Sequence, residues 1–99
     1  NETIKFYVAK NLKDNSFINR DKSKVLLKEE FFKQSHEVTF RSLTEIIKFV
    51  GQKHYSSRGK KVDKIIDKLK SVSKSSFKLT LGNCIIHKVN NSIIVLKEH

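Results

Sequence analysis

The 99-residue chain contains no proline, methionine or tryptophan, and its one cysteine is Cys84. A single cysteine excludes a disulfide within the chain and is compatible with a reducing compartment. Long apolar runs are also missing, because stretches such as residues 93–96 are far shorter than the roughly 20 residues of a membrane-spanning helix. These absences predict a protein that is not inserted in a membrane, and we expect it in the cytoplasm.

The lack of methionine also concerns the start of the chain, which opens on Asn1. We therefore expect a segment excised from a larger protein. A chain of this length can bury roughly 60–70% of its unfolded surface around one modest core. The sequence predicts a single domain over residues 1–99 and excludes a multidomain enzyme.

Positive charge is abundant, and it is unevenly distributed. The net charge is +11, and residues 1–50 hold ten Lys/Arg against seven Asp/Glu, whereas residues 51–99 hold eleven against three. Clustered cations bind polyanions by releasing condensed counterions, so this asymmetry favours a phosphate-rich partner. The alternative is that the positive charge reflects codon composition, because an AT-rich genome also enriches lysine, isoleucine and asparagine in any protein.

Apolar residues recur at helical spacing near the start, at Ile4, Tyr7, Val8 and Leu12, and they predict a leading helix over residues 1–14.

Short apolar runs at residues 17–18 and 25–27 flank a polar turn and predict two short strands, followed by a helical turn within residues 28–34.

Two longer amphipathic helices are predicted on either side of an elbow at residues 51–61. The first follows Ser35 and ends at Gly51, which is a usual C-terminal stop. Its apolar stripe comprises Phe40, Leu43, Ile46, Ile47 and Val50. The stripe of the second comprises Val62, Ile65, Ile66, Leu69 and Val72.

The last quarter of the chain shows the alternation typical of β structure. Residues 77–81 predict a half-buried strand that ends at residues 82–83. Residues 84–89 and 92–97 flank Asn90-Asn91, a dipeptide that suits a two-residue hairpin turn.

The two-residue turn also fixes the register of the hairpin. Ile86 should pair with Val95 and Ile85 with Leu96, which leaves apolar side chains on both faces. We expect helices on one face and another domain on the other. The fold class is therefore α+β, with amphipathic helices packed on a small C-terminal antiparallel sheet or hairpin and a core unit over residues 35–99.

Catalytic and metal-binding constellations are not recognisable. Cys84 with a histidine would mimic a nucleophile and base, but a thiol on an apolar strand is far more often a core residue. The four histidines show no metal-ligand spacing. Asp63 and Asp67 lie one turn apart among lysines, which indicates a solvated ion-pair face. No glycine loop could cradle a phosphate, so we expect no catalytic residue, metal or cofactor in this chain.

A basic surface has stronger support. At 100° per residue the lysines of the second helix fall on the arc away from its apolar stripe, and the elbow adds cations and rings that can stack on bases. The helix start favours phosphate. The candidate RNA-binding residues are Arg41, Lys53, His54, Arg58, Lys60, Lys61, Lys64 and Lys68. The structural alternative is that Tyr55 fills the core and Arg58 braces the loop.

About residues 38–99 resemble the middle region of bacterial tRNA(Ile)-lysidine synthases. The resemblance lies in FRSLTEIIKFVGQKHYSSRGKKVDKIIDKL and FKLTLGNCIIHKVNNSIIVLKEH. The matching positions are Arg41 and Leu43, Gly51, the elbow at 55–58, and the strand at 80–84. Two serines stand at 56–57 where the family has prolines, and Asn83 replaces its second glycine.

The resemblance implies a parent ligase that uses ATP with Mg to adenylate the wobble cytidine of tRNA(Ile) with anticodon CAU, after which free lysine displaces AMP. The family's Ser-Gly-Gly-x-Asp-Ser loop, which binds ATP in an N-terminal catalytic domain, is not in these residues. The implied role is a tRNA-recognition domain, inactive alone, with tRNA(Ile) and the catalytic domain as partners. The alternatives are a structural module that docks a neighbouring domain and a general RNA-binding module.

Overall fold

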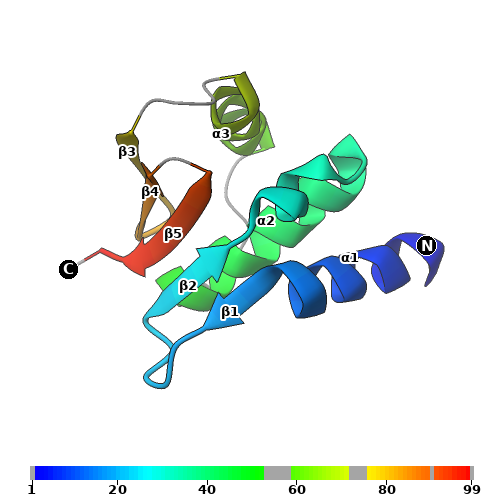
Figure 1. The fold of residues 1–99 in the computed structure, drawn as a ribbon, viewed down its shortest axis with the longest axis horizontal. Coiled ribbons are helices and arrows are strands. Elements are labelled where there is room, and N and C mark those ends of the chain that lie inside the picture. Colours follow the sequence, from blue (N-terminus) through cyan, green and yellow to red (C-terminus); the bar gives the residue numbers. More distant parts are fainter. Residues whose placement is uncertain (1, 53–58, 72–75, 90, 99) are drawn as a thin grey trace.

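The computed structural model describes residues 2–52, 59–71, 76–89 and 91–98, which form three α-helices, one 3-10 helix and five strands in an α+β fold (Figure 1). The elements in chain order are α1 (Glu2–Asn15), β1 (Ser16–Ile18), β2 (Lys24–Leu27), the 3-10 helix η1 (Glu29–Lys33), α2 (His36–Gly51), α3 (Gly59–Ser71), β3 (Phe77–Leu81), β4 (Cys84–Val89) and β5 (Ser92–Lys97). The predicted fold class is confirmed.

The five strands form one antiparallel sheet in the order β1-β2-β5-β4-β3. The predicted register of the last hairpin is confirmed, since Ile86 lies opposite Val95 and Ile85 opposite Leu96. The sheet is larger than the predicted C-terminal one, because β2 pairs with β5 and adds the β1–β2 hairpin to its edge. Strand β5 therefore lies at the centre of the sheet, between the β1–β2 hairpin and the strands β4 and β3.

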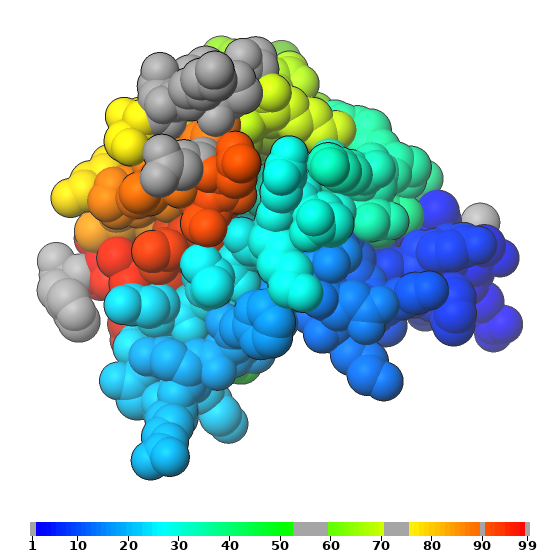
Figure 2. Space-filling model, in the orientation of Figure 1, coloured from blue at the N-terminus to red at the C-terminus, as the bar shows by residue number. Residues whose placement is uncertain are grey.

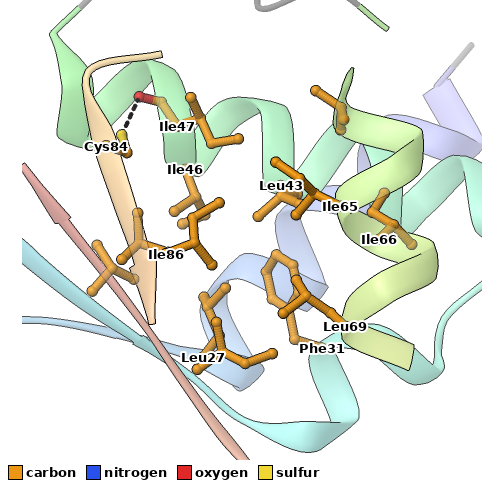
Figure 3. Packing of buried hydrophobic residues seen from close by; sticks show 14 of the residues in the cluster. Leu27, Phe31, Leu43, Ile46, Ile47, Ile65, Ile66, Leu69, Cys84 and Ile86 are labelled. Atoms are coloured by element: carbon orange, nitrogen blue, oxygen red, sulfur yellow. Dashed lines mark hydrogen bonds between the residues drawn. The ribbon is translucent and has the colours of Figure 1, made fainter. Parts of the chain in front are cut away.

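The core lies between one face of the sheet and the helices α2 and α3 (Figure 3). Leu43, Ile66 and Ile86 are fully buried there and represent α2, α3 and β4. Leu27 and Phe31 are also fully buried, so the core extends beyond the predicted unit of residues 35–99. Truncating one such side chain to alanine costs about 2–5 kcal/mol, which makes this layer the main source of stability.

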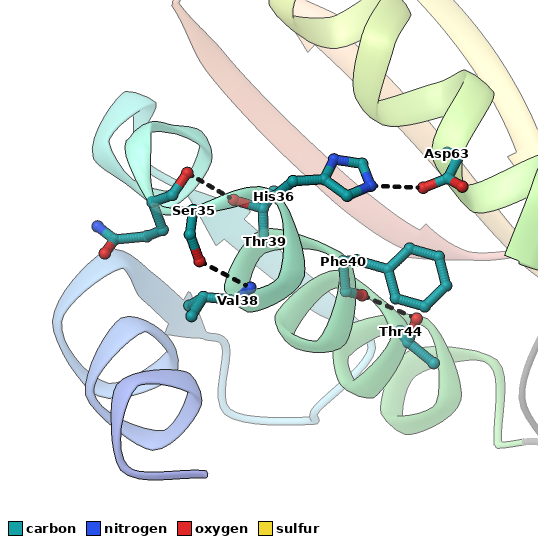
Figure 4. A network of polar contacts seen from close by, with 8 residues as sticks. Ser35, His36, Val38, Thr39, Phe40, Thr44 and Asp63 are labelled. Carbon is teal, nitrogen blue, oxygen red and sulfur yellow. Dashed lines mark hydrogen bonds and ion pairs between the residues drawn. The ribbon is translucent and has the colours of Figure 1, made fainter. Parts of the chain in front are cut away.

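Helix α2 begins at a side-chain cap. The Ser35 hydroxyl accepts a hydrogen bond from the Val38 amide over 3.3 Å (Figure 4). The Thr39 amide donates to the Ser35 carbonyl over 2.9 Å. The first contact satisfies an amide that a helix start leaves without an intrahelical partner, and the second is the first regular hydrogen bond of the helix. The predicted start after Ser35 is confirmed.

The end of α2 differs in detail from the prediction. Gly51 is the last helical residue, and the left-handed conformation (φ 55°) that often follows a helix end is adopted by Gln52. Gly51 serves close packing instead, because a Cβ there would overlap the carbonyl oxygen of Gly82 in the β3–β4 turn. The glycine thus lets the end of α2 approach the sheet.

Helix α1 is joined to the body by one buried amide. Asn11 is 1% exposed, and its side-chain nitrogen donates to the Phe31 carbonyl over 3.2 Å and to the Ser42 hydroxyl over 3.1 Å. The side-chain nitrogen of Asn15 donates to the side-chain oxygen of Asn11 over 2.8 Å. Helix α1 is therefore fixed to η1 and α2 at its C-terminal half, while Figure 1 shows its first turns projecting from the body.

Candidate nucleic-acid interface

Helix α3 presents a sharply divided surface. Val62 and Ile66 are fully buried, and Ile65 and Leu69 are 8% and 5% exposed. The opposite surface, here called the lysine face, comprises Lys60, Lys61, Lys64 and Lys68, all exposed. At 100° per residue these four lysines fall within an arc of about 100° that points away from the core. The structure therefore brings four of the eight predicted site residues together.

The lysine face keeps most of its charge. Among the residues that the structure describes, Lys60, Lys61 and Lys64 form no salt bridge. The Lys68 ammonium lies 5.1 Å from the centroid of the Phe77 ring, an attractive contact that leaves its charge intact. Lysine charge that is not paired in a salt bridge is available to an external anion.

The two carboxylates of α3 lie beside the lysine face rather than within it. Asp63 is directed to α2, where its Oδ1 is 2.9 Å from the His36 Nε2 (Figure 4). The expected pairing of Asp63 with lysines of its own helix is therefore not seen; its partner is a histidine. This contact ties the start of α2 to α3 and keeps one negative charge turned from the lysine face.

Arg41 is held apart from the lysine face. It lies on α2, where its guanidinium is 3.0 Å from the Glu37 carboxylate one turn earlier. It also lines a groove between α1 and α2, together with Val8, Leu12 and Phe40. The ion pair offsets part of its charge, so Arg41 is a weaker candidate for phosphate binding than the lysines. Sequence reasoning did not find the groove, because the packing of α1 on α2 sets its position.

The predicted elbow residues Lys53, His54 and Arg58, together with Tyr55, lie outside the described residues.

Cys84 is a core residue. It is 0% exposed, and its thiol donates to the Ile47 carbonyl over 3.3 Å (Figure 3). Burial of this kind separates the sulfur from solvent and from any substrate.

Within the described ranges, no three His, Cys, Asp or Glu side chains are grouped to hold a metal ion. None of the helices in the same ranges has the length and the apolar character of a membrane span.

One charged residue near α3 was missed from the sequence. Lys88 is only 4% exposed, and its ammonium donates to the Leu69 carbonyl over 3.1 Å. That carbonyl lies in the last turn of α3, where a cation is favoured by the helix dipole. The alternation of Cys84, Ile86 and Lys88 along β4 placed this lysine on the core face and could have identified it.

Comparison with known proteins finds no family model, no curated protein and no solved structure that matches the chain.

Proposed function

We propose that the chain is an RNA-binding accessory domain that holds tRNA through the lysine face of α3. The observation that carries the proposal is the group of exposed, unneutralised ammonium groups at Lys60, Lys61 and Lys64. Lys68 belongs to the same face, and the sequence adds Arg41, Lys53, His54 and Arg58 as further candidate RNA contacts.

The size of the lysine face suits a nucleic-acid backbone. Residues 60–68 span about 12 Å along the axis of α3, at 1.5 Å per residue. One strand of a duplex carries three to four phosphates over that axial length. Each lysine can therefore meet a different phosphate along one segment of RNA.

The substrate follows from the resemblance to tRNA(Ile)-lysidine synthases in residues 38–99. In this proposal the parent is an ATP-dependent ligase that converts the wobble cytidine of tRNA(Ile) to lysidine. ATP, Mg and lysine bind its catalytic domain, and the present chain positions the tRNA without performing chemistry.

A charge-matched pair of variants tests the proposal by filter binding to tRNA(Ile). Lys60→Ala/Lys61→Ala/Lys64→Ala should weaken binding at least tenfold and reduce the slope of log K against log salt by about 2–3. The control Lys10→Ala/Lys13→Ala/Arg20→Ala removes the same charge from exposed residues of α1 and the β1–β2 turn. Equal effects of the two variants would reject the lysine face.

Binding to different RNAs distinguishes a domain specific to tRNA(Ile) from a general RNA-binding module. A lysidine synthase domain should prefer tRNA(Ile) with anticodon CAU over an elongator tRNA of equal length. Equal affinity for both would support the alternative of a general RNA-binding module.

A further inference from the structure

The side of the sheet that faces away from the helices carries several apolar side chains, as the predicted register of β4 and β5 implies. Strand alternation and the observed register place these residues in two rows across the sheet, here called the outer face. The first row is Phe17, Leu26, Ile94, His87 and Lys78, and the second is Lys24, Leu96, Ile85 and Thr80.

The aliphatic members of the outer face do not belong to the core. The strand residues in the main buried cluster alternate along each strand with those of the outer face and point to the opposite side of the sheet. They are Val25, Leu27, Cys84, Ile86, Ile93 and Val95. Phe17 is 53% exposed and Leu26 is 38% exposed, while Ile85, Ile94 and Leu96 are half-buried. Antiparallel sheets with one solvated face normally carry polar residues on it. A contiguous apolar stripe at the centre of this face therefore indicates a binding surface.

The charge of the outer face has a single sign. The five strands contain no Asp or Glu. Lys24 lies at one end of the second row and Lys78 at the other end of the first, so cations border the apolar stripe on both sides. The Lys28 ammonium lies 5.2 Å from the centroid of the Phe17 ring and adds charge at the β1 edge. The complement of this surface is apolar at its centre and acidic at its margins.

The width of the apolar stripe indicates which kind of structural element can bind to it. Leu26, Ile94 and Ile85 lie on the adjacent strands β2, β5 and β4, whose outer axes are about 10 Å apart. An α-helix with its side chains is about 10–12 Å wide. We propose that the outer face binds one amphipathic helix of a protein partner, whose apolar stripe is flanked by aspartate and glutamate. This interaction is independent of RNA binding by the lysine face.

Other occupants fit the outer face less well. A second copy of the chain would set lysines against lysines across a face without carboxylates. Single-stranded nucleic acid needs neighbouring rings on which its bases stack, but Phe17 and His87 are separated by β2 and β5, a distance of about 14 Å. The aliphatic centre thus favours a protein helix over bases.

Photo-cross-linking in the source cells tests the occupant. A photo-reactive phenylalanine analogue replaces Ile94 in the full-length protein that contains this chain, and adducts are mapped by mass spectrometry. A matched protein carries the analogue at Lys13, an exposed position on α1. The proposal expects an adduct, specific to position 94, on a helical segment with apolar residues at i, i+3 and i+4 and an excess of Asp and Glu.

The alternatives give different adducts. Cross-linking at position 94 to nucleic acid, to lipid, to a second copy of the chain or to a segment without an acidic amphipathic pattern would overturn the proposal. Absence of an adduct specific to that position would overturn it as well.

A charge reversal then tests recognition without disturbing the apolar stripe. The mapped segment, made as a peptide, should bind Lys24→Glu/Lys78→Glu about tenfold more weakly than the unmodified chain. Lys10→Glu/Lys13→Glu changes the net charge equally and should leave peptide affinity within about twofold. Circular dichroism verifies that both variants are folded, and equal peptide affinity for the two would overturn the proposal. Because the measurement contains no RNA, its result is independent of the proposed tRNA binding.

Discussion

Gly51 at the end of α2 lies so close to Gly82 in the β3–β4 turn that a methyl group on Gly51 would overlap the Gly82 carbonyl oxygen. Backbone atoms occupy both sides of this contact, so neither side can move aside by changing a rotamer. The contact sets how closely α2 approaches the sheet.

Substituting Gly51→Ala should therefore destabilise the protein. Helix propensity alone would predict a gain of about 1 kcal/mol, whereas the overlap predicts a loss of about 1–3 kcal/mol in the free energy of unfolding. Urea denaturation measures the difference. Lys48→Ala, on the same helix, should change stability by less than about 0.5 kcal/mol. A more stable Gly51→Ala protein would contradict the observed contact.

The buried amide of Asn11 provides a second test. Asn11→Leu replaces the polar amide by an apolar side chain of similar size and leaves the Phe31 carbonyl and the Ser42 hydroxyl without this donor. We expect a loss of about 1–3 kcal/mol, together with faster amide hydrogen exchange in α1. Lys10→Ala, one residue away and exposed, serves as the control. Unchanged exchange in α1 would show that Asn11 does not hold this helix.

The β1–β2 turn contains a carboxylate with a perturbed acidity. Hydrogen bonds from the Ser23 hydroxyl, and next from the Ser23 amide, lower the pKa of Asp21 below its ordinary value of 3.8. A pKa that is lower in the folded than in the unfolded state contributes stability above the unfolded value, and that contribution is lost as pH falls through the folded value.

Substituting Ser23→Ala should raise the pKa of Asp21 toward 3.8, as measured by NMR titration of its side-chain carbon. Ser35→Ala removes a hydroxyl from a distant helix cap and should leave this titration unchanged. An Asp21 titration that is the same with and without the Ser23 hydroxyl would contradict the assigned cause.

Asp67 offers a test of the lysine face by gain of affinity. This exposed carboxylate lies on α3 beside Lys64 and should repel a bound phosphate backbone. Asp67→Asn should therefore strengthen tRNA binding about twofold, which corresponds to a unit charge at about 10 Å in water. Asp14→Asn changes the net charge equally at the end of α1 and should have a smaller effect. A larger gain in tRNA affinity for Asp14→Asn than for Asp67→Asn would show that the RNA binds elsewhere.

Local patterns in the sequence predicted much of this fold. The Asn90-Asn91 dipeptide predicted the register of β4 and β5, because a two-residue loop permits one pairing of the strands on either side of it, and the observed pairing agrees. The spacing of Val62, Ile65 and Ile66 located the buried side of α3 and hence the lysines opposite. Each of these features depends on residues that are close in the chain.

The parts that were not predicted depend on distant residues. Val25 pairs with Val95 across 70 positions, and a strand of four residues contains no signal for so remote a partner. The role of Gly51 required the position of Gly82, and the partner of Asp63 required the packing of α2 on α3. The lysines of the candidate site were found because helical periodicity is local. The separate position of Arg41 depended on tertiary packing.

The central place of β5 also has a consequence for biosynthesis. Residues 92–97 leave the ribosome after β2 and β4, yet both of these strands hydrogen-bond to them. Until they emerge from the exit tunnel, the β1–β2 hairpin has no neighbour in the sheet and Leu27 has no Ile93 beside it. During that interval β2 and β4 expose unpaired strand edges in the nascent chain, a state that is prone to aggregation and favours chaperone binding.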